Sequence, residues 1–322
     1  MTYTSGGLIQ ATDYNGFAST TANANVNDVW GAGATDKGWG QSPLATVAAT
    51  NTVTATQWAS LVNTISSMAS HTGTTITSRV APTAGNLIQV LANLNTDLTN
   101  ITTNRGNAVA NGTQFTGWTG TNSKTAATSG APWTITFTNT VTFASADAAR
   151  YFFNAGGRIK IDVSKTSTGA TGDPEWNDLA NTLCGDIYIT GGSTTQTIAG
   201  TAYTGTTKVG GTGTPNTLAT TTGWYDLTAG AAATIVYKQF ADTAPYTSNY
   251  IQHAIAKGAS SNTLVITTTW YAADGDPITG GTAASGATPG TAPCTIVTYF
   301  PPSTTYLGTA SWGTPTVAAT TA

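Results

Sequence analysis

The segment "GDPEWNDL" brings three acidic residues, Asp173, Glu175 and Asp178, close together in the sequence. A polysaccharide-cleaving enzyme needs a pair of such carboxylates at the bond it breaks. A glycine-rich run precedes this segment and a proline lies inside it. Acidic residues are also common in the first turn of a helix, where they interact favourably with its dipole. We therefore expect a turn leading into a short helix here, rather than a catalytic site.

The remaining residues that could do chemistry are isolated. Asp274 and Asp276 are spaced as in a Ca²⁺-binding loop, but the further oxygen ligands and the distal bidentate acid are missing, and Asp-Gly is a strong hairpin signal. His71 and His253 have no cysteine or second histidine nearby in the sequence. No nucleophile elbow, Walker loop or dinucleotide fingerprint occurs. The sequence thus predicts a non-enzymatic protein without a metal site or cofactor.

The stretch "ARYFFNAGG" places Arg150 directly before Tyr151, Phe152 and Phe153. A guanidinium beside aromatic rings could stack on sugars or bind carboxylates. The stretch lies between two strand-like patterns, however, so we expect a turn of helix followed by a tight turn at 154–157. In that setting the aromatic residues cover the end of a sheet, and Arg150 pairs with a nearby Asp or with turn carbonyls.

The composition limits the possible partners. Charged residues make up only 8% of the 322 residues, the net charge is −3, and the eleven Lys and Arg residues form no basic run. Nucleic-acid binding needs clustered basic residues, so we expect none. No signal peptide or long apolar stretch is visible, which predicts synthesis in the cytoplasm and no membrane insertion. We expect Cys184 and Cys294 to be free, buried thiols.

The first 105 residues have the pattern of a helical module. A weak helix is predicted within 12–30, and a stronger one follows a Thr cap at Thr54 or Thr56, with apolar residues from Trp58 onward at helical spacing. A third segment carries five apolar residues at alternating steps of four and three: Leu87, Leu91, Leu94, Leu98 and Ile101.

This heptad seam is too short to form a coiled coil alone. Two arrangements bury it equally well. The five residues pack either inside a helical bundle of one subunit, or between subunits about a symmetry axis, where they would form an oligomer or attachment interface.

After the helical module the period changes to two. In "WTITFTNTVTF" the residues Trp133, Ile135 and Phe137 alternate with threonines, and "RIKIDVS" repeats the pattern with Arg158, Lys160 and Asp162 expected outside. Further strands are predicted at 186–190, 234–240, 262–271 and 295–300. The sequence therefore predicts an α+β protein: a helical attachment or oligomerisation module (1–105), a linker (106–132) and an antiparallel, jelly-roll-like β-sandwich (133–322).

Several phrases, in order, resemble virion structural proteins of tailed bacteriophages, especially cyanophages and other contractile-tailed aquatic phages. The N-terminal phrases are "GGLIQATDYNGFA", "VNDVWGAGATDKGWGQ" and "VTATQWASLVNTI". The C-terminal phrases are "VTFASADAARYFFNAGGRIKI", "EWNDL", "GWYDLT", "YTSNYIQHAIAK" and "LVITTTWYAADGDP".

The resemblance implies a virion component assembled in the host cytoplasm, in contact with other virion proteins. We expect a tail or neck fibre or another appendage that docks to the particle through its N-terminal module and exposes its β domain. A host surface glycan or protein is a further expected partner of the β domain. Fibres of this kind are commonly trimers, so the resemblance and the leucine seam together predict a homotrimer. The alternatives are a capsid decoration protein and, among enzymes, a tailspike-like polysaccharide depolymerase.

Overall fold

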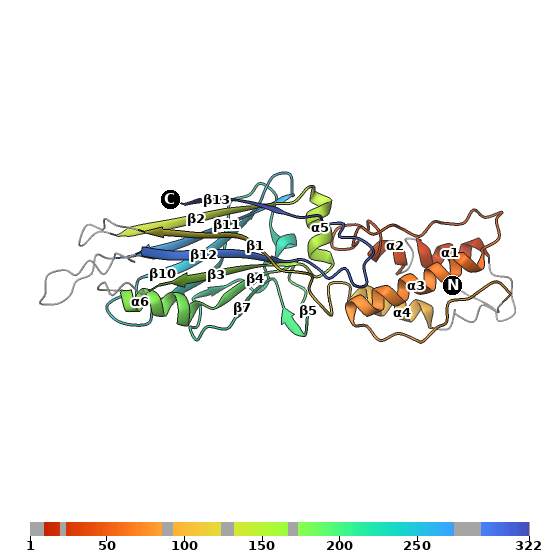
Figure 1. The fold of residues 1–322 in the computed structure, drawn as a ribbon, viewed down its shortest axis with the longest axis horizontal. Helices are drawn as coiled ribbons and strands as arrows, with labels where there is room; N and C mark the ends of the chain where they lie inside the picture. The colour runs from red at the N-terminus through yellow and green to blue at the C-terminus, as the bar shows by residue number, and fades with distance from the viewer. Residues whose placement is uncertain are drawn as a thin grey trace, which may run out of the picture.

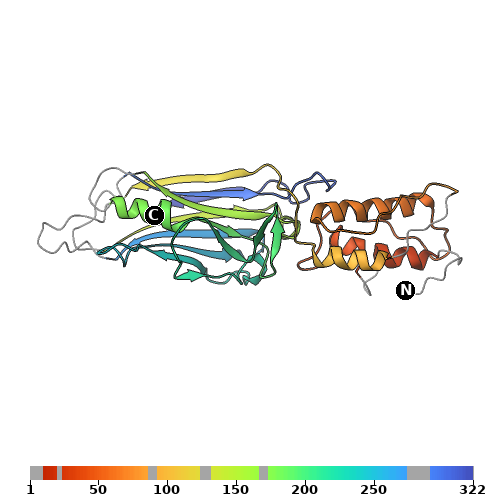
Figure 2. The same cartoon turned by 90° about the horizontal axis from the view of Figure 1, so that it is seen from below.

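The computed structural model describes residues 10–19, 24–85, 93–123, 132–166, 173–273 and 291–321. It is elongated, with a helical module at one end and two packed β-sheets at the other (Figure 1). The view from below shows the same end-to-end arrangement (Figure 2). The predicted α+β class with a β-sandwich is confirmed.

The described helices of the N-terminal module are α1 (Ala11–Ala18), α2 (Val26–Val29), α3 (Ala55–Thr72) and α4 (Leu94–Thr103). The predicted Thr cap of the long helix is Thr54, whose side chain accepts from the backbone N–H of Gln57 and completes a capping box. The helix ends at Gly73, which adopts the left-handed conformation with φ of 69°. Its apolar stripe faces α1 through Trp58, which meets the ring of Tyr14 edge-on at 5.7 Å.

The heptad seam is buried within this single chain where it is described. Leu94, Leu98 and Ile101 are each 0% exposed and belong to the chain's own hydrophobic core, whereas Leu87 and Leu91 lie outside the described residues. The structure therefore places these three side chains in the bundle of one subunit, the first of the two arrangements above. These three side chains therefore expose no surface that could form a seam between subunits.

In the described part of the chain, the β domain consists of two antiparallel sheets and one hairpin. The five-stranded sheet has the order β1 (Phe115–Ser123), β12 (Thr291–Phe300), β3 (Arg158–Lys165), β4 (Asp186–Ile189) and β7 (Thr206–Val209). The six-stranded sheet has the order β13 (Thr316–Thr321), β2 (Trp133–Thr142), β11 (Thr263–Ala272), β10 (Tyr250–Lys257), β9 (Thr234–Phe240) and β8 (Thr217–Leu218). The hairpin pairs β5 (Gln196–Ile198) with β6 (Thr201–Tyr203).

The alternating pattern of β2 is confirmed by its burial. Every second side chain from Trp133 to Val141 is buried, and the threonines between them face outward. In β3 the alternation also holds for Ile159 and Ile161, but Arg158, which we expected on the outer face, is only 4% exposed. It is covered because the β5–β6 hairpin contributes Tyr203, whose ring lies 4.8 Å from the guanidinium carbon.

The predicted linker contains a strand. Residues 115–123 form β1, an edge strand that pairs with β12 along its length, so the sandwich begins before residue 133. A side chain at Gly117 would lie 2.4 Å from Cγ2 of Val317 in β13. Glycine therefore permits the two edge strands of the opposing sheets to approach each other closely.

The stretch "ARYFFN" lies in helix α5 (Ala146–Asn154), which connects β2 to β3 at the end of the sandwich that faces the helical module (Figure 1). Phe152 and Phe153 are completely buried and contact Phe143, and Phe153 also stacks on Trp224 at 5.3 Å. The predicted corner, with its aromatic residues covering the sheet end, is confirmed. The other face of helix α5 forms the junction with the N-terminal module.

Candidate functional site

The centre of the junction between the two modules is Trp39, which is 0% exposed. Its indole Nε1 donates to the carbonyl of Asn154 at the end of α5, at 3.1 Å, and to the carbonyl of Arg105 after α4, at 3.2 Å. Its ring meets His71 of α3 edge-on, with centroids 4.8 Å apart. One side chain thus contacts helix α3, the segment that follows α4, and helix α5 of the β domain.

The side chain of Asn154 completes this contact. Its Nδ2 donates to the carbonyls of Lys37, at 2.7 Å, and Gly38, at 3.0 Å, while its Oδ1 accepts from the hydroxyl of Tyr225 at 2.6 Å. Burial raises the pKa of Tyr225, so its hydroxyl stays protonated and remains a donor. The amide is therefore satisfied on both sides, and it joins the 31–40 loop to the β domain.

Arg150 belongs to the same junction. Its guanidinium donates to the carboxylate of Asp147, at 3.0 Å, and to the carbonyl of Lys37, at 2.6 Å, and lies over the ring of Tyr151 at 4.9 Å. The predicted pairing with a nearby Asp and with turn carbonyls is confirmed. The residue bonds across the module boundary instead of facing an open ligand site.

Two further polar contacts cross the boundary. Gln41 donates to the carbonyl of Thr309 and accepts from its backbone N–H, both at 2.9 Å, which ties the 31–41 segment to the chain that leads into β13. Nε2 of His71 donates to the carbonyl of Ala155 at 3.0 Å. Burial lowers the pKa of His71 to about 4, so the ring is neutral at pH 7.

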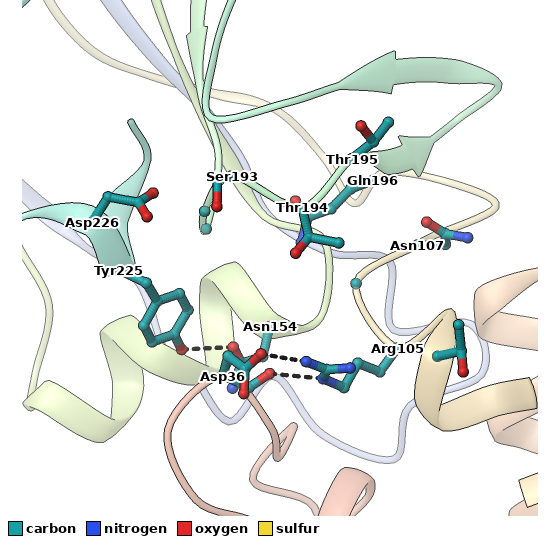
Figure 3. A pocket seen from close by; sticks show the side chains of 14 residues that line it. Asp36, Arg105, Asn107, Asn154, Ser193, Thr194, Thr195, Gln196, Tyr225 and Asp226 are labelled. Atoms are coloured by element: carbon teal, nitrogen blue, oxygen red, sulfur yellow. Dashed lines mark hydrogen bonds and ion pairs between the residues drawn. The ribbon is translucent and has the colours of Figure 1, made fainter. Parts of the chain in front are cut away.

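A pocket of about 160 Å³ opens at one side of the junction (Figure 3). Asp36 and Arg105 come from the N-terminal module, and Ser193, Thr194, Tyr225 and Asp226 come from the β domain. Arg105 forms an ion pair with the carboxylate of Asp36 and also donates to its carbonyl. Most of the lining side chains are polar, and the exposed residues 193–195 and Asp226 border its opening.

The other candidate residues that the structure describes lie in a short helix or are buried. Helix α6 (Asp173–Asp178) begins at Asp173, so the predicted helix start is confirmed, and Asp274 and Asp276 lie outside the described residues. His253 is completely buried, with Nδ1 3.0 Å from the hydroxyl oxygen of Thr268. Both cysteines are free and buried, as expected. Within the described ranges, no three His, Cys, Asp or Glu residues are grouped so that they could hold a metal ion.

No family model matches the chain, and no curated protein or solved structure shows significant similarity to it. The class of the protein is thus defined by the structure itself, an α+β protein with an N-terminal helical module joined to a β-sandwich. Among the residues that the structure describes, no helix has the length and apolar character needed to span a membrane.

Proposed function

We propose that the chain is a non-enzymatic structural component of a bacteriophage virion, a tail or neck fibre or a similar appendage. It docks to the particle through its helical module and exposes its β domain. The observation that supports this most strongly is the end-to-end arrangement of the modules (Figure 1). Trp39 and Asn154 join them through buried hydrogen bonds, which holds the sandwich in one direction relative to a docked helical module.

The sequence supports the same proposal independently. The phrases that resemble virion proteins come from both modules, and "GWGQ" and "ARYFFNAGG" supply the residues of the junction itself. Few charges and two free thiols suit a protein that is assembled in a reducing compartment and then persists outside it.

The homotrimer stays a prediction. Because Leu94, Leu98 and Ile101 are buried in one chain, the described part of the seam gives no support to it, and a subunit interface would have to use another surface. Analytical ultracentrifugation of the full chain tests this prediction, and a monomer at high concentration contradicts it.

The proposed function is tested on purified particles of a phage that encodes this chain. Quantitative mass spectrometry should detect the chain at tens of copies or fewer per particle, relative to the major capsid protein. Hundreds of copies would favour a decoration protein, and absence from the particle would overturn the proposal. Release of reducing ends from host polysaccharide, abolished by Glu175→Gln, would replace it with the depolymerase alternative.

A further inference from the structure

The junction pocket contains several polar groups that no protein atom satisfies. Among the described residues, the hydroxyls of Ser193 and Thr194 and the amide nitrogen of Asn107 make no hydrogen bond to the protein, although all three line the pocket. Oε1 of Gln196 is buried and also lacks a donor. Ser193 and Thr194 are exposed, so their hydroxyls can bond a ligand in place of water.

Two glycines shape the side of the pocket. A side chain at Gly192 would lie 3.7 Å from both Oδ2 of Asp226 and Cβ of Tyr225. A side chain at Gly106 would lie 2.4 Å from the amide nitrogen of Gln196. Glycine at position 106 therefore lets the Gln196 side chain pack against the backbone, and glycine at position 192 leaves the space beside Asp226 and Tyr225 unfilled.

The charges in the pocket restrict the class of ligand. Asp36 and Asp226 contribute carboxylates from the two modules, while the guanidinium of Arg105 is already paired with Asp36. An anion would be repelled by the Asp226 carboxylate, and an apolar molecule would leave the hydroxyls and amides unsatisfied. A ligand that both donates to carboxylates and accepts from hydroxyls and amides fits all of these groups.

The size of the pocket and its aromatic residue restrict the class of ligand further. Its volume of about 160 Å³ is well below the roughly 300–1,000 Å³ of pockets for drug-sized ligands and corresponds to one small ring with its substituents. Tyr225 adds an aromatic side chain beside Asp226 (Figure 3), and aromatic residues provide large, rigid apolar contact area next to polar groups.

We propose that the junction pocket binds a single neutral sugar residue. Its hydroxyls donate to Asp226 and accept from Ser193, Thr194 and the amide of Asn107. Because the pocket is lined by both modules, the bound sugar also contacts both. This proposal does not depend on the virion assignment, since a soluble protein of any origin could carry such a pocket, and either proposal can fail without the other.

The test uses the full chain with glucose, galactose and N-acetylglucosamine as probes, measured by saturation-transfer NMR and by calorimetry, with inorganic phosphate as the anionic comparison. We expect millimolar binding of at least one sugar and none of phosphate. Ser193→Ala/Thr194→Ala should weaken sugar binding by about tenfold, since each lost neutral hydrogen bond contributes roughly 0.5–1.5 kcal/mol, or about two- to tenfold. Asp226→Asn keeps an acceptor for the backbone N–H of Gly223, and this variant should also bind the sugar more weakly.

The matched control is Thr247→Ala, which removes an exposed hydroxyl from a different surface cleft and should leave the affinity unchanged. Circular dichroism of each variant checks that it is folded. The proposal is overturned if none of the three sugars binds, if phosphate binds in their place, or if the double variant of residues 193 and 194 binds as tightly as the unmodified chain.

Discussion

The indole nitrogen of Trp39 donates to the backbone carbonyl of Asn154, 3.1 Å away and 115 positions later in the chain. Trp39 belongs to the helical module, and Asn154 ends helix α5, which faces this module from the β domain. Because the bond is completely buried, water cannot replace it when it is lost. The two modules are therefore expected to unfold as one cooperative unit.

Trp39→Phe removes the donor to the buried carbonyl of Asn154 and to the part-buried carbonyl of Arg105. We expect a loss of about 2–4 kcal/mol, from the unpaired acceptors and the smaller ring, measured by urea unfolding. Trp30→Phe is the matched control, because its indole bonds the carbonyl of Ser42 at an exposed position and should cost about 1 kcal/mol or less. Equal losses in the two variants would show that the buried bonds at Trp39 do not hold the junction.

Gly40→Ala tests the close contact between the modules. Gly40 has a φ of 67°, and a side chain there would lie 2.3 Å from the ring of Tyr151 in α5. Gly210 has a similar φ of 71° but open space around it. Gly210→Ala should therefore cost only the backbone term of about 1–2 kcal/mol, whereas Gly40→Ala should cost about 1–3 kcal/mol more from the steric overlap. Thermal denaturation with equal losses would contradict the packing of Tyr151 on this loop.

Acid should weaken the junction through His71. Its pKa is about 4 in the folded chain because the ring is buried, against roughly 6.5 when unfolded. The contribution of neutral His71 to the free energy of unfolding is fully present above about pH 6.5. It falls as the pH drops toward 4, by about 3 kcal/mol in all. Burial also lowers the pKa of His253, to about 3, so this residue likewise reduces the free energy of unfolding as the pH falls.

His71→Gln keeps a donor for the carbonyl of Ala155 and removes the titrating ring. Urea unfolding at a series of pH values between 7 and 4 should give a shallower decline for this variant than for the unmodified chain, with the contribution of His253 remaining. Identical slopes would contradict the buried, neutral state of His71.

Arg158 should stabilise the β5–β6 hairpin. Its guanidinium carbon lies 4.8 Å from the ring centre of Tyr203 and 4.6 Å from that of Phe300, and Nη1 donates to Asn111 at 2.6 Å. Arg158→Met should cost about 2 kcal/mol or more, as for a desolvated cation–π contact, and should speed amide exchange in residues 196–203. The control Lys238→Met loses a partly exposed contact with Tyr250 and should cost about 0.5–1 kcal/mol. Unchanged exchange in the hairpin would contradict this role for Arg158.

The elements with a regular period were predictable from the sequence, and those that depend on distant residues were not. The strand at 234–240 was predicted with its observed bounds because apolar and β-branched residues dominate it. Strand β1 was missed because Gly117 and Gly120 interrupt its pattern, and Gly117 is needed there to fit against Val317. Burial of Arg158 depends on a hairpin that begins at Gln196, which no local pattern indicates.

The candidate site was the least predictable feature. The sequence correctly assigned Arg150 to a structural corner, but it gave no sign that Trp39 and Asn154 meet. The pocket combines residues from Asp36 to Asp226, most of them hydroxyl and amide side chains that are abundant throughout the chain. Their spacing carries no information, since only the packing of two modules brings them together.

The most direct test of the account is a cryo-electron microscopy map of the virion into which this structure is fitted. We predict density for the elongated chain on the tail, neck or baseplate, with helices α1, α3 and α4 against the particle and the sandwich directed outward. A map in which the sandwich contacts the particle and the helical module points away, or in which no density fits the chain, would contradict attachment through the N-terminal module.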